Sequence, residues 1–134
     1  MPSKSVYVVD DEKVAREGIA LVLKKKYQVK SFASAESAIE VIEREPPDLV
    51  LLDIGLPGIN GIEALVQIKR LYPEMIVIMM SAYDDEETVV PAMSLGAYDY
   101  LVKPLEMRAL IDTIQYALQT AATRGHSQTH DYIS

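Results

Sequence analysis

Three short apolar runs, none of which alternates with polar residues, predict buried strands. They cover residues 6–9, 49–52 and 76–80. Unbroken apolar runs of this length suit strands that are buried on both faces, as in a parallel sheet covered by helices. Two alternating segments, at residues 27–32 and 98–102, suit the edges of the same sheet. The pattern therefore predicts five strands.

Apolar residues at helical spacing fill the intervals between and after these strands, at residues 14–23, 35–42, 62–69 and 107–121. The segment 86–95 is weaker because Pro91 lies within it. Proline lacks the backbone donor and clashes with the preceding turn, so we expect this helix to start late or to have a distorted first turn. Strand and helix alternate five times, which implies right-handed crossovers and a parallel sheet. The sequence predicts a doubly wound α/β fold.

The domain organisation follows from length and from where the periodicity stops. A chain of 134 residues is long enough for one domain with a core and too short for two. Beyond about residue 121 the sequence turns polar and loses its helical spacing. We therefore predict a single domain over residues 1–121, followed by a polar linker or tail over residues 122–134.

Composition and charge narrow the class of protein. An apolar fraction of 49% with 25% charged residues indicates a globular chain, and no apolar run approaches the roughly 20 residues of a membrane span. No cysteine is present, which excludes disulfides and thiolate chemistry. The net charge of −7 disfavours direct binding to nucleic acid, which usually requires a basic face. We expect a cytoplasmic protein without membrane association, whose partners are proteins and a small cation.

Polar side chains stand at the carboxyl ends of four predicted strands. Asp10 and Asp11 follow the first strand, Asp53 the third, Ser81 the fourth and Lys103 the fifth. In open α/β sheets, ligands bind beyond the carboxyl ends of the strands. We therefore expect three carboxylates, a hydroxyl and an ammonium group to converge on one rim.

This combination of groups predicts magnesium and phosphoryl chemistry. Three carboxylates repel one another, so their convergence requires a compensating cation. Oxygen ligands alone favour Mg²⁺, which commonly uses one or two carboxylates and keeps water or phosphate oxygens as its other ligands. The remaining carboxylate is then free to act as a nucleophile toward phosphorus, giving an aspartyl phosphate. Lys103 and Ser81 are expected to bind phosphoryl oxygens.

Each residue also has a simpler interpretation when it is taken alone. Asp10 and Asp11 suit a helix start, where the dipole favours acids, and Asp53 suits a turn. Ser81 suits a cap or a turn, and Lys103 suits a surface charge. The combination of three aspartates at neighbouring strand ends favours the functional interpretation.

Four segments resemble the motifs of the response-regulator receiver family. Residues 8–12 (VVDDE) resemble its acidic pair, residues 51–61 (LLDIGLPGING) its phosphoacceptor loop, and residues 80–82 (MSA) its Ser/Thr-Ala step. Residues 96–104 (GAYDYLVKP) resemble the segment that carries its aromatic switch residue and its lysine. The similarity covers about residues 6–121, and the motifs follow in the order of the family.

The resemblance implies a flavodoxin-like fold whose five-stranded parallel sheet has the order 2-1-3-4-5. It also implies that Asp53 is the phosphoacceptor and that Mg²⁺ is bound by Asp11, Asp53 and the backbone carbonyl of Gly55, with Asp10 acting through water. Ser81 and Lys103 would bind the phosphoryl group.

Two further expectations rest on the resemblance. Tyr100 is the implied aromatic residue that turns inward when Ser81 moves, although by itself it suits a packed residue of an edge strand. The peptide bond between Lys103 and Pro104 is expected to be cis, which is otherwise uncommon.

The function implied by the resemblance is that of a phosphorylated switch in a two-component phosphorelay. The donor would be a phosphohistidine on a sensor histidine kinase or phosphotransfer protein, or a small molecule such as acetyl phosphate. The change would pass to an output domain or effector, with transcription regulation as the expected process and a homodimer as one possible phosphorylated state. Such a switch is not an enzyme acting on other substrates, because it catalyses only its own phosphorylation and dephosphorylation.

Three alternatives remain at this point. A magnesium-dependent aspartate-nucleophile hydrolase usually places a second acid two residues after the nucleophile, where this chain has Gly55. A flavin-binding module needs a loop after the first strand that cradles phosphate, whereas Asp10 and Asp11 would repel it. A receiver that binds proteins without being phosphorylated is the third alternative, and the complete acidic set argues against it.

Overall fold

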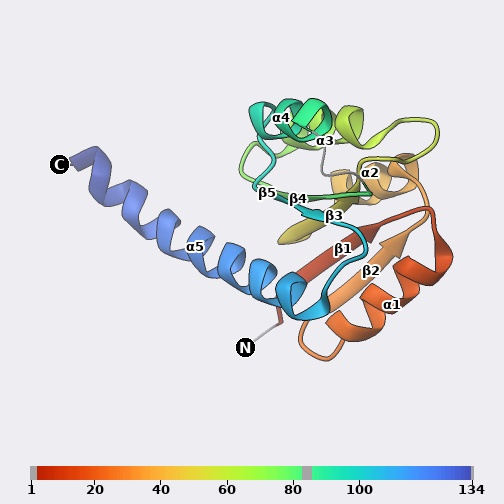
Figure 1. The fold of residues 1–134 in the computed structure, drawn as a ribbon. Coiled ribbons are helices and arrows are strands. Elements are labelled where there is room, and N and C mark those ends of the chain that lie inside the picture. Colours follow the sequence, from red (N-terminus) through yellow and green to blue (C-terminus); the bar gives the residue numbers. More distant parts are fainter. Residues whose placement is uncertain (1–2, 83–85, 134) are drawn as a thin grey trace.

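The computed structural model describes residues 3–82 and 86–133, with the backbone alone for residue 86 and residues 122–133. Within these residues, strands and helices alternate along the chain (Figure 1). The strands are β1 (Ser5–Val9), β2 (Gln28–Phe32), β3 (Leu49–Asp53), β4 (Ile76–Ser81) and β5 (Asp99–Val102). The helices are α1 (Lys13–Leu23), α2 (Ala35–Arg44), α3 (Gly61–Leu71), α4 (Glu86–Ser94) and α5 (Met107–Ile133).

The strands form one parallel sheet in the order β2-β1-β3-β4-β5. Its interior strands β3 and β4 are buried along their whole length, and β1 is buried after its first residue. The edge strands β2 and β5 are partly exposed. The unbroken apolar runs therefore occupy the centre of the sheet and the alternating segments its edges, as predicted. The predicted fold class and strand order are confirmed.

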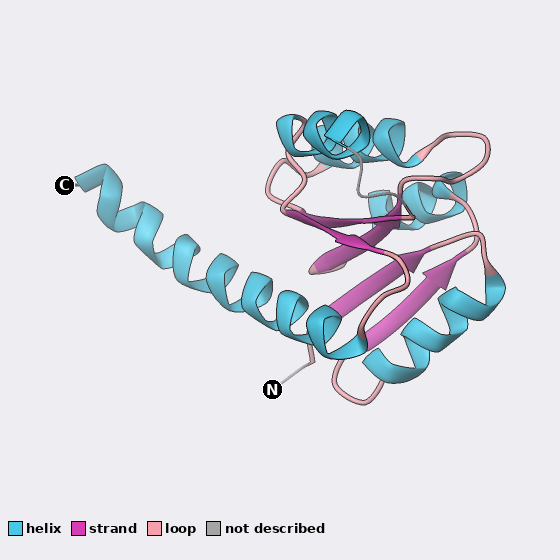
Figure 2. Ribbon diagram, in the orientation of Figure 1, coloured by secondary structure: helices cyan, strands magenta, loops and turns pink. Residues whose placement is uncertain are grey.

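Helices cover both faces of the sheet (Figure 2). On one face, α1 and α5 bury aliphatic residues against the strands, among them Ile19, Leu23, Leu110 and Ile114. On the other face, α2, α3 and α4 do the same with Ala38, Ile42, Leu65 and Ala92. The sheet thus lies between two apolar layers, and this burial supplies most of the driving force for the fold.

Side-chain caps fix the starts of two helices near the carboxyl edge of the sheet. Ser34 accepts a hydrogen bond from the Ser37 backbone N–H (3.2 Å) ahead of α2. Asn60 accepts one from the Glu63 N–H (3.0 Å) ahead of α3. Each cap satisfies a donor that the helix itself leaves free. These helices therefore begin at defined residues directly after the loops that follow β2 and β3.

Two helices differ from the prediction. Helix α4 already starts at Glu86 and Pro91 lies inside it, so the late start expected from the proline is wrong. The alternative, a distorted first turn, stays a prediction. Helix α5 continues to Ile133, so the backbone of residues 122–133 is helical, although the loss of apolar spacing had predicted a linker or tail there. Apolar spacing reports a buried face, and a helix that projects from the domain, as α5 does in Figure 1, does not need one. Whether this segment serves as a linker stays a prediction.

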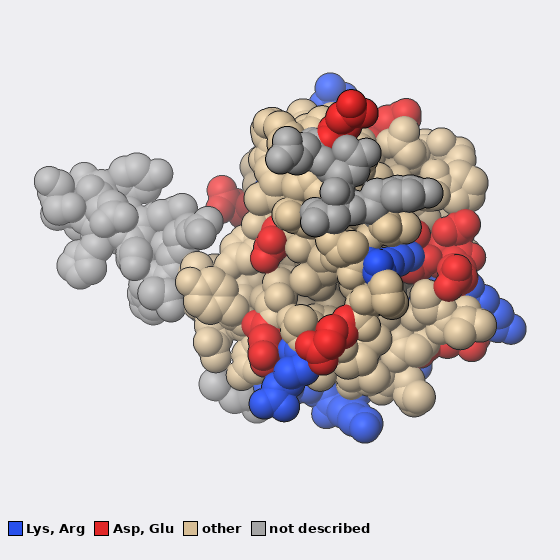
Figure 3. All heavy atoms as spheres, in the orientation of Figure 1, with Lys and Arg blue, Asp and Glu red and all other residues tan. Residues whose placement is uncertain are grey.

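Charged side chains of both signs are interspersed on the face of the molecule shown in Figure 3. Among the described residues, none of the helices combines the length and the apolar character that a membrane span requires.

Candidate functional site

Three aspartates meet at the carboxyl edge of the sheet. Strands β1 and β3 are neighbours, with Val9 paired to Leu52, so the next residues, Asp10 and Asp53, lie side by side. One carboxylate oxygen each from Asp10, Asp11 and Asp53 lies within 4.8 Å of the others. Asp10 is completely buried, Asp53 is 7% exposed and Asp11 faces solvent. The structure thus brings together the three carboxylates that the strand ends had indicated.

Lys103 reaches this cluster from the end of β5. Its ammonium group donates hydrogen bonds to Asp10 Oδ2 (2.8 Å) and to Asp53 Oδ2 (3.1 Å). Its backbone N–H donates to the Ser81 carbonyl at the end of β4 (2.6 Å). The peptide bond to Pro104 is cis, as expected. One ammonium against three carboxylates leaves an excess of negative charge, which favours a bound cation.

Backbone groups fix the orientation of both buried carboxylates. Asp53 Oδ1 accepts a hydrogen bond from the Gly55 N–H (2.9 Å), and Asp10 Oδ1 accepts one from the Glu12 N–H (3.0 Å). Arg16 on α1 donates to the Asp10 carbonyl (2.8 Å). These bonds satisfy polar groups that would otherwise be costly to bury. Arg16 had not been predicted, because an arginine six residues after an aspartate has no distinguishing pattern.

The surroundings of Asp53 and Lys103 shift both pKa values. Burial is the largest influence on Asp53 and raises its pKa, and the Asp10 charge adds to this. The Gly55 N–H and Lys103 act in the opposite direction without cancelling the shift. For Lys103, burial is the largest single influence and acts to lower the pKa, but the hydrogen bonds to Asp10 and Asp53 and the charges of both together outweigh it, so the pKa is raised. Lys103 is therefore held as a cation beside a carboxyl group that resists ionisation.

Ser81 and Tyr100 lie at different depths of the sheet. Ser81 is the last residue of β4, is buried, and stands on the same rim as Asp53, because Asp53 pairs with Met80 in the β3–β4 register. Tyr100 lies within the edge strand β5, half-buried, with its ring packed on the core layer beneath α2, α3 and α4. The structure thus places Ser81 at the site and Tyr100 two positions behind the end of its strand, and the movement of Tyr100 stays a prediction.

The loop between β3 and α3 folds back beside Asp53. Its two ends are joined by a hydrogen bond from the Gly61 N–H to the Ile54 carbonyl (3.0 Å). Gly55 is exposed, and a Cβ built on it would lie 3.7 Å from Asp53 Oδ1. This residue therefore lies directly against the carboxylate, where its backbone is available to a ligand.

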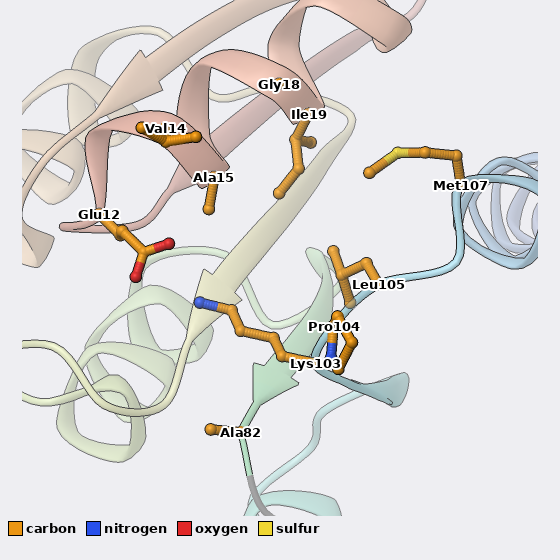
Figure 4. Close-up of a pocket in the computed structure, with 10 residues that line it drawn as sticks. All are labelled: Glu12, Val14, Ala15, Gly18, Ile19, Ala82, Lys103, Pro104, Leu105 and Met107. Atoms are coloured by element: carbon orange, nitrogen blue, oxygen red, sulfur yellow. The ribbon is translucent and has the colours of Figure 1, made fainter.

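An apolar groove of about 530 Å³ leads to Lys103 between α1 and the segment after β5 (Figure 4). Its walls include Val14 and Ile19 from α1 and Leu105 and Met107 from the facing segment. Lys103 lines the same groove. The cluster is therefore bordered on this side by an apolar groove.

The donor set of the cluster fits Mg²⁺. All the candidate ligand atoms are oxygens, which hard divalent cations prefer. Asp11 faces solvent, so an ion bound beside it can keep the water ligands that Mg²⁺ gives up reluctantly. Nitrogen and sulfur ligands, which transition metals favour, are absent from the group of described residues.

Comparisons with known proteins agree on one family. Residues 6–115 match the model of the response regulator receiver domain. The chain is 32% identical over 131 residues to the transcriptional regulatory protein DegU of Brevibacillus brevis, covering 96% of this chain and 56% of DegU. It is 39% identical over 110 residues to the response regulator protein FleR of Pseudomonas aeruginosa, covering 81% of this chain and 23% of FleR.

A solved structure extends this agreement to three dimensions. The response regulator receiver domain protein (CheY-like) of Methanospirillum hungatei JF-1 matches with a TM-score of 0.88 and 31% identity, covering 91% of this chain and 98% of that one. The chain thus spans nearly all of a solved receiver domain, but only 56% and 23% of the two curated relatives. With its fold, its acidic rim and its sequence in agreement, this chain belongs to the response regulator receiver family, whose members act as signalling switches in two-component systems.

Proposed function

We propose that this chain is a phosphoacceptor switch and that Asp53 receives the phosphoryl group. The observation that carries the proposal is the difference between the two aspartates that contact Lys103. Asp10 has no exposed surface, whereas Asp53 retains 7% and stands beside the open loop at Gly55. Only Asp53 therefore combines contact with the ammonium group and access for an incoming phosphorus atom.

The same cluster is the proposed magnesium site. Asp11, Asp53 and the backbone carbonyl of Gly55 would hold Mg²⁺, with Asp10 acting through a water molecule. When bound, Mg²⁺ neutralises charge on the transferring phosphoryl group and aligns it with the nucleophile. The excess negative charge of the cluster and its oxygen-only donors support this assignment.

In the proposed reaction, a carboxylate oxygen of Asp53 attacks the phosphorus of the donor. A new O–P bond forms, the bond from phosphorus to the donor breaks, and its electron pair leaves with the imidazole of a phosphohistidine or with acetate. Lys103, already 3.1 Å from Asp53 Oδ2, exchanges this contact for a phosphoryl oxygen. Ser81 donates a hydrogen bond to another phosphoryl oxygen, and Tyr100 follows into the space that Ser81 leaves.

The donor and the reader of the switch belong to the same proposal. A sensor histidine kinase or phosphotransfer protein supplies the phosphoryl group, and the groove along α1 gives such a protein a surface next to Lys103. An output domain or effector reads the altered surface, by a shift between two conformations. The name of DegU as a transcriptional regulatory protein supports an output in transcription. The chain acts as a switch rather than as an enzyme on other substrates, and it does not bind nucleic acid itself.

The test is a measurement of intact mass after incubation with acetyl phosphate and Mg²⁺. We expect the protein to gain one phosphoryl group, and we expect no gain with EDTA or in the Asp53→Asn variant. Asp112→Asn is the matched control, because it removes an exposed carboxylate on α5 that lies outside the cluster. Uptake by Asp53→Asn at the wild-type rate would show that the acceptor is wrong. Magnesium binding without any uptake would favour a receiver that acts without phosphorylation by small donors.

A further inference from the structure

The tip of the loop between β3 and α3 is held by a side chain from another helix. Glu36 Oε2 accepts a hydrogen bond from the Ile59 backbone N–H (3.4 Å). The same oxygen lies 2.7 Å from the position that a Cβ on Gly58 would take. The carboxylate of Glu36 therefore rests directly on the backbone of residues 58 and 59, although it lies more than twenty positions earlier in the sequence.

Helix α2 presents this carboxylate from a fixed position. Glu36 lies in its first turn, two residues after the Ser34 cap. Ala35 and Ala38 on either side of it are completely buried against the sheet. The helix start cannot shift without opening this packing, so the loop is the part that adapts to the contact.

The loop that is held in this way carries the backbone of the proposed metal site. Gly55 donates to Asp53 at the beginning of the loop, and the Gly61 N–H closes its base on Ile54. Between these two points, Leu56 and Ile59 pack on the core layer beneath α2, α3 and α4, and Asn60 caps α3. Glu36 adds a hydrogen bond from α2 to the backbone at the tip of the loop. Gly58 has a φ of +71°, which glycine adopts without strain, and it leaves the space that the carboxylate fills.

We propose that Glu36 is a positioning residue for the magnesium site. By holding the Ile59 N–H and packing on Gly58, it fixes the loop and thereby the Gly55 carbonyl beside Asp53. The inference rests on the proposed role of Gly55 and Asp53 in binding Mg²⁺. Residues that orient metal ligands without touching the metal commonly contribute to metal affinity.

A simpler role for Glu36 makes a different prediction. An acid in the first turn of a helix is favoured by the helix dipole, and this effect depends on its charge. The loop contact depends instead on an acceptor oxygen at the right place. Glutamine keeps an acceptor oxygen and removes the charge, so Glu36→Gln separates the two roles.

The test measures magnesium binding to the metal-free protein by titration calorimetry, together with hydrogen exchange of the Ile59 amide by NMR. We expect Glu36→Ala to weaken magnesium binding by about three- to tenfold and to speed the exchange of the Ile59 amide. Glu36→Gln is expected to stay within about twofold of wild type. Glu40→Ala is the matched control, because it removes another exposed acid of α2, whose partner is Arg44 on the same helix.

A double-mutant cycle with Gly58 adds a second route to the same contact. Gly58→Ala places a methyl group where the Glu36 carboxylate lies. Part of the effect of Gly58→Ala on magnesium affinity is therefore expected to disappear when Glu36 is already alanine. Wild-type affinity in Glu36→Ala, or equal losses in Glu36→Gln and Glu36→Ala, would overturn the inference and leave the proposed function intact. Absence of magnesium binding in the wild type would overturn the proposed function itself.

Discussion

At the scale of single residues, the site places two buried carboxylates close together, which lowers the stability of the fold. Asp10 and Asp53 are both buried and share one ammonium group, Lys103. Burial raises the pKa of Asp53, and the nearby Asp10 charge adds to the shift, so the ionised side chain destabilises the metal-free fold. Groups with shifted pKa values of this kind cluster at functional sites, where reactivity is maintained at some cost in stability.

This shift predicts the effect of Asp53→Asn on stability. Asparagine keeps the shape and the acceptor oxygen and removes the charge, so we expect a higher midpoint of thermal unfolding near neutral pH in EDTA. The pKa of Asp53 is higher in the folded state than in the unfolded state, so its contribution to stability is fully present below the ordinary aspartate pKa and is lost as the pH rises through the folded value. The advantage of the variant should therefore shrink as the medium becomes acidic. Thermal unfolding followed by circular dichroism across this pH range checks the prediction, which a lower midpoint for the variant at neutral pH would contradict.

At the scale of elements, the junction of β3 and α3 depends on one close approach of backbone to backbone. A Cβ built on Gly61 would lie 2.4 Å from the Asp53 carbonyl oxygen and 2.5 Å from Ile54 Cα. These atoms belong to the backbone and cannot move aside as a flexible side chain does. The helix therefore starts directly against the strand that carries Asp53, and a glycine is required there.

Gly61→Ala is expected to destabilise the protein by about 1–3 kcal/mol, since it forces two elements apart. It should also weaken magnesium binding, because the same junction sets the base of the loop. The matched control is Gly18→Ala in α1, where a Cβ meets nothing within 4 Å. In a helix interior that change should stabilise the fold by about 0.5–1 kcal/mol. Urea unfolding of the two variants provides the comparison, and equal stability of both would show that the junction tolerates a side chain.

At the scale of the whole molecule, helix α5 is longer than the part of it that packs on the domain. Among the described side chains of α5, the buried ones are Leu110, Ile114 and Ala117, and the family match ends at residue 115. The helix nevertheless continues to Ile133. Folding of the receiver should therefore depend on the first half of α5 rather than on its full length.

A chain shortened to residues 1–121 is expected to keep its stability within about 1 kcal/mol and to take up phosphate from acetyl phosphate at the same rate. A chain shortened to residues 1–112 serves as the comparison. This shorter chain lacks the buried residues Ile114 and Ala117. We expect its free energy of unfolding to fall by about 3 kcal/mol or more, as it does when buried core residues are truncated. Unfolding midpoints and intact mass report both effects. A large loss of stability in the chain of residues 1–121 would show that residues 122–134 belong to the domain.

The sequence predicted the architecture because the spacing of apolar residues along the chain depends on which faces of each strand and helix are buried. Unbroken apolar runs such as residues 49–52 identified the central strands, and the alternation of strand and helix implied the parallel sheet. The rim followed from the same reasoning, because parallel strands end at one edge and bring Asp10 and Asp53 together there. The late start expected for α4 was wrong, because Pro91 had been taken as a sign of the helix boundary although it lies inside the helix. In α5, the helical backbone continues beyond the residue where the apolar spacing stops.

Only the tertiary structure decided which residues far apart in the sequence contact one another. The sequence by itself determined the fold class, the strand order through its family motifs, and the set of residues at the rim. It did not determine that Lys103 joins Asp10 to Asp53, or that Glu36 rests on Gly58 and Ile59. Periodicity records which face of an element is buried, whereas the partner of an exposed or half-buried polar side chain depends on how separate elements pack together.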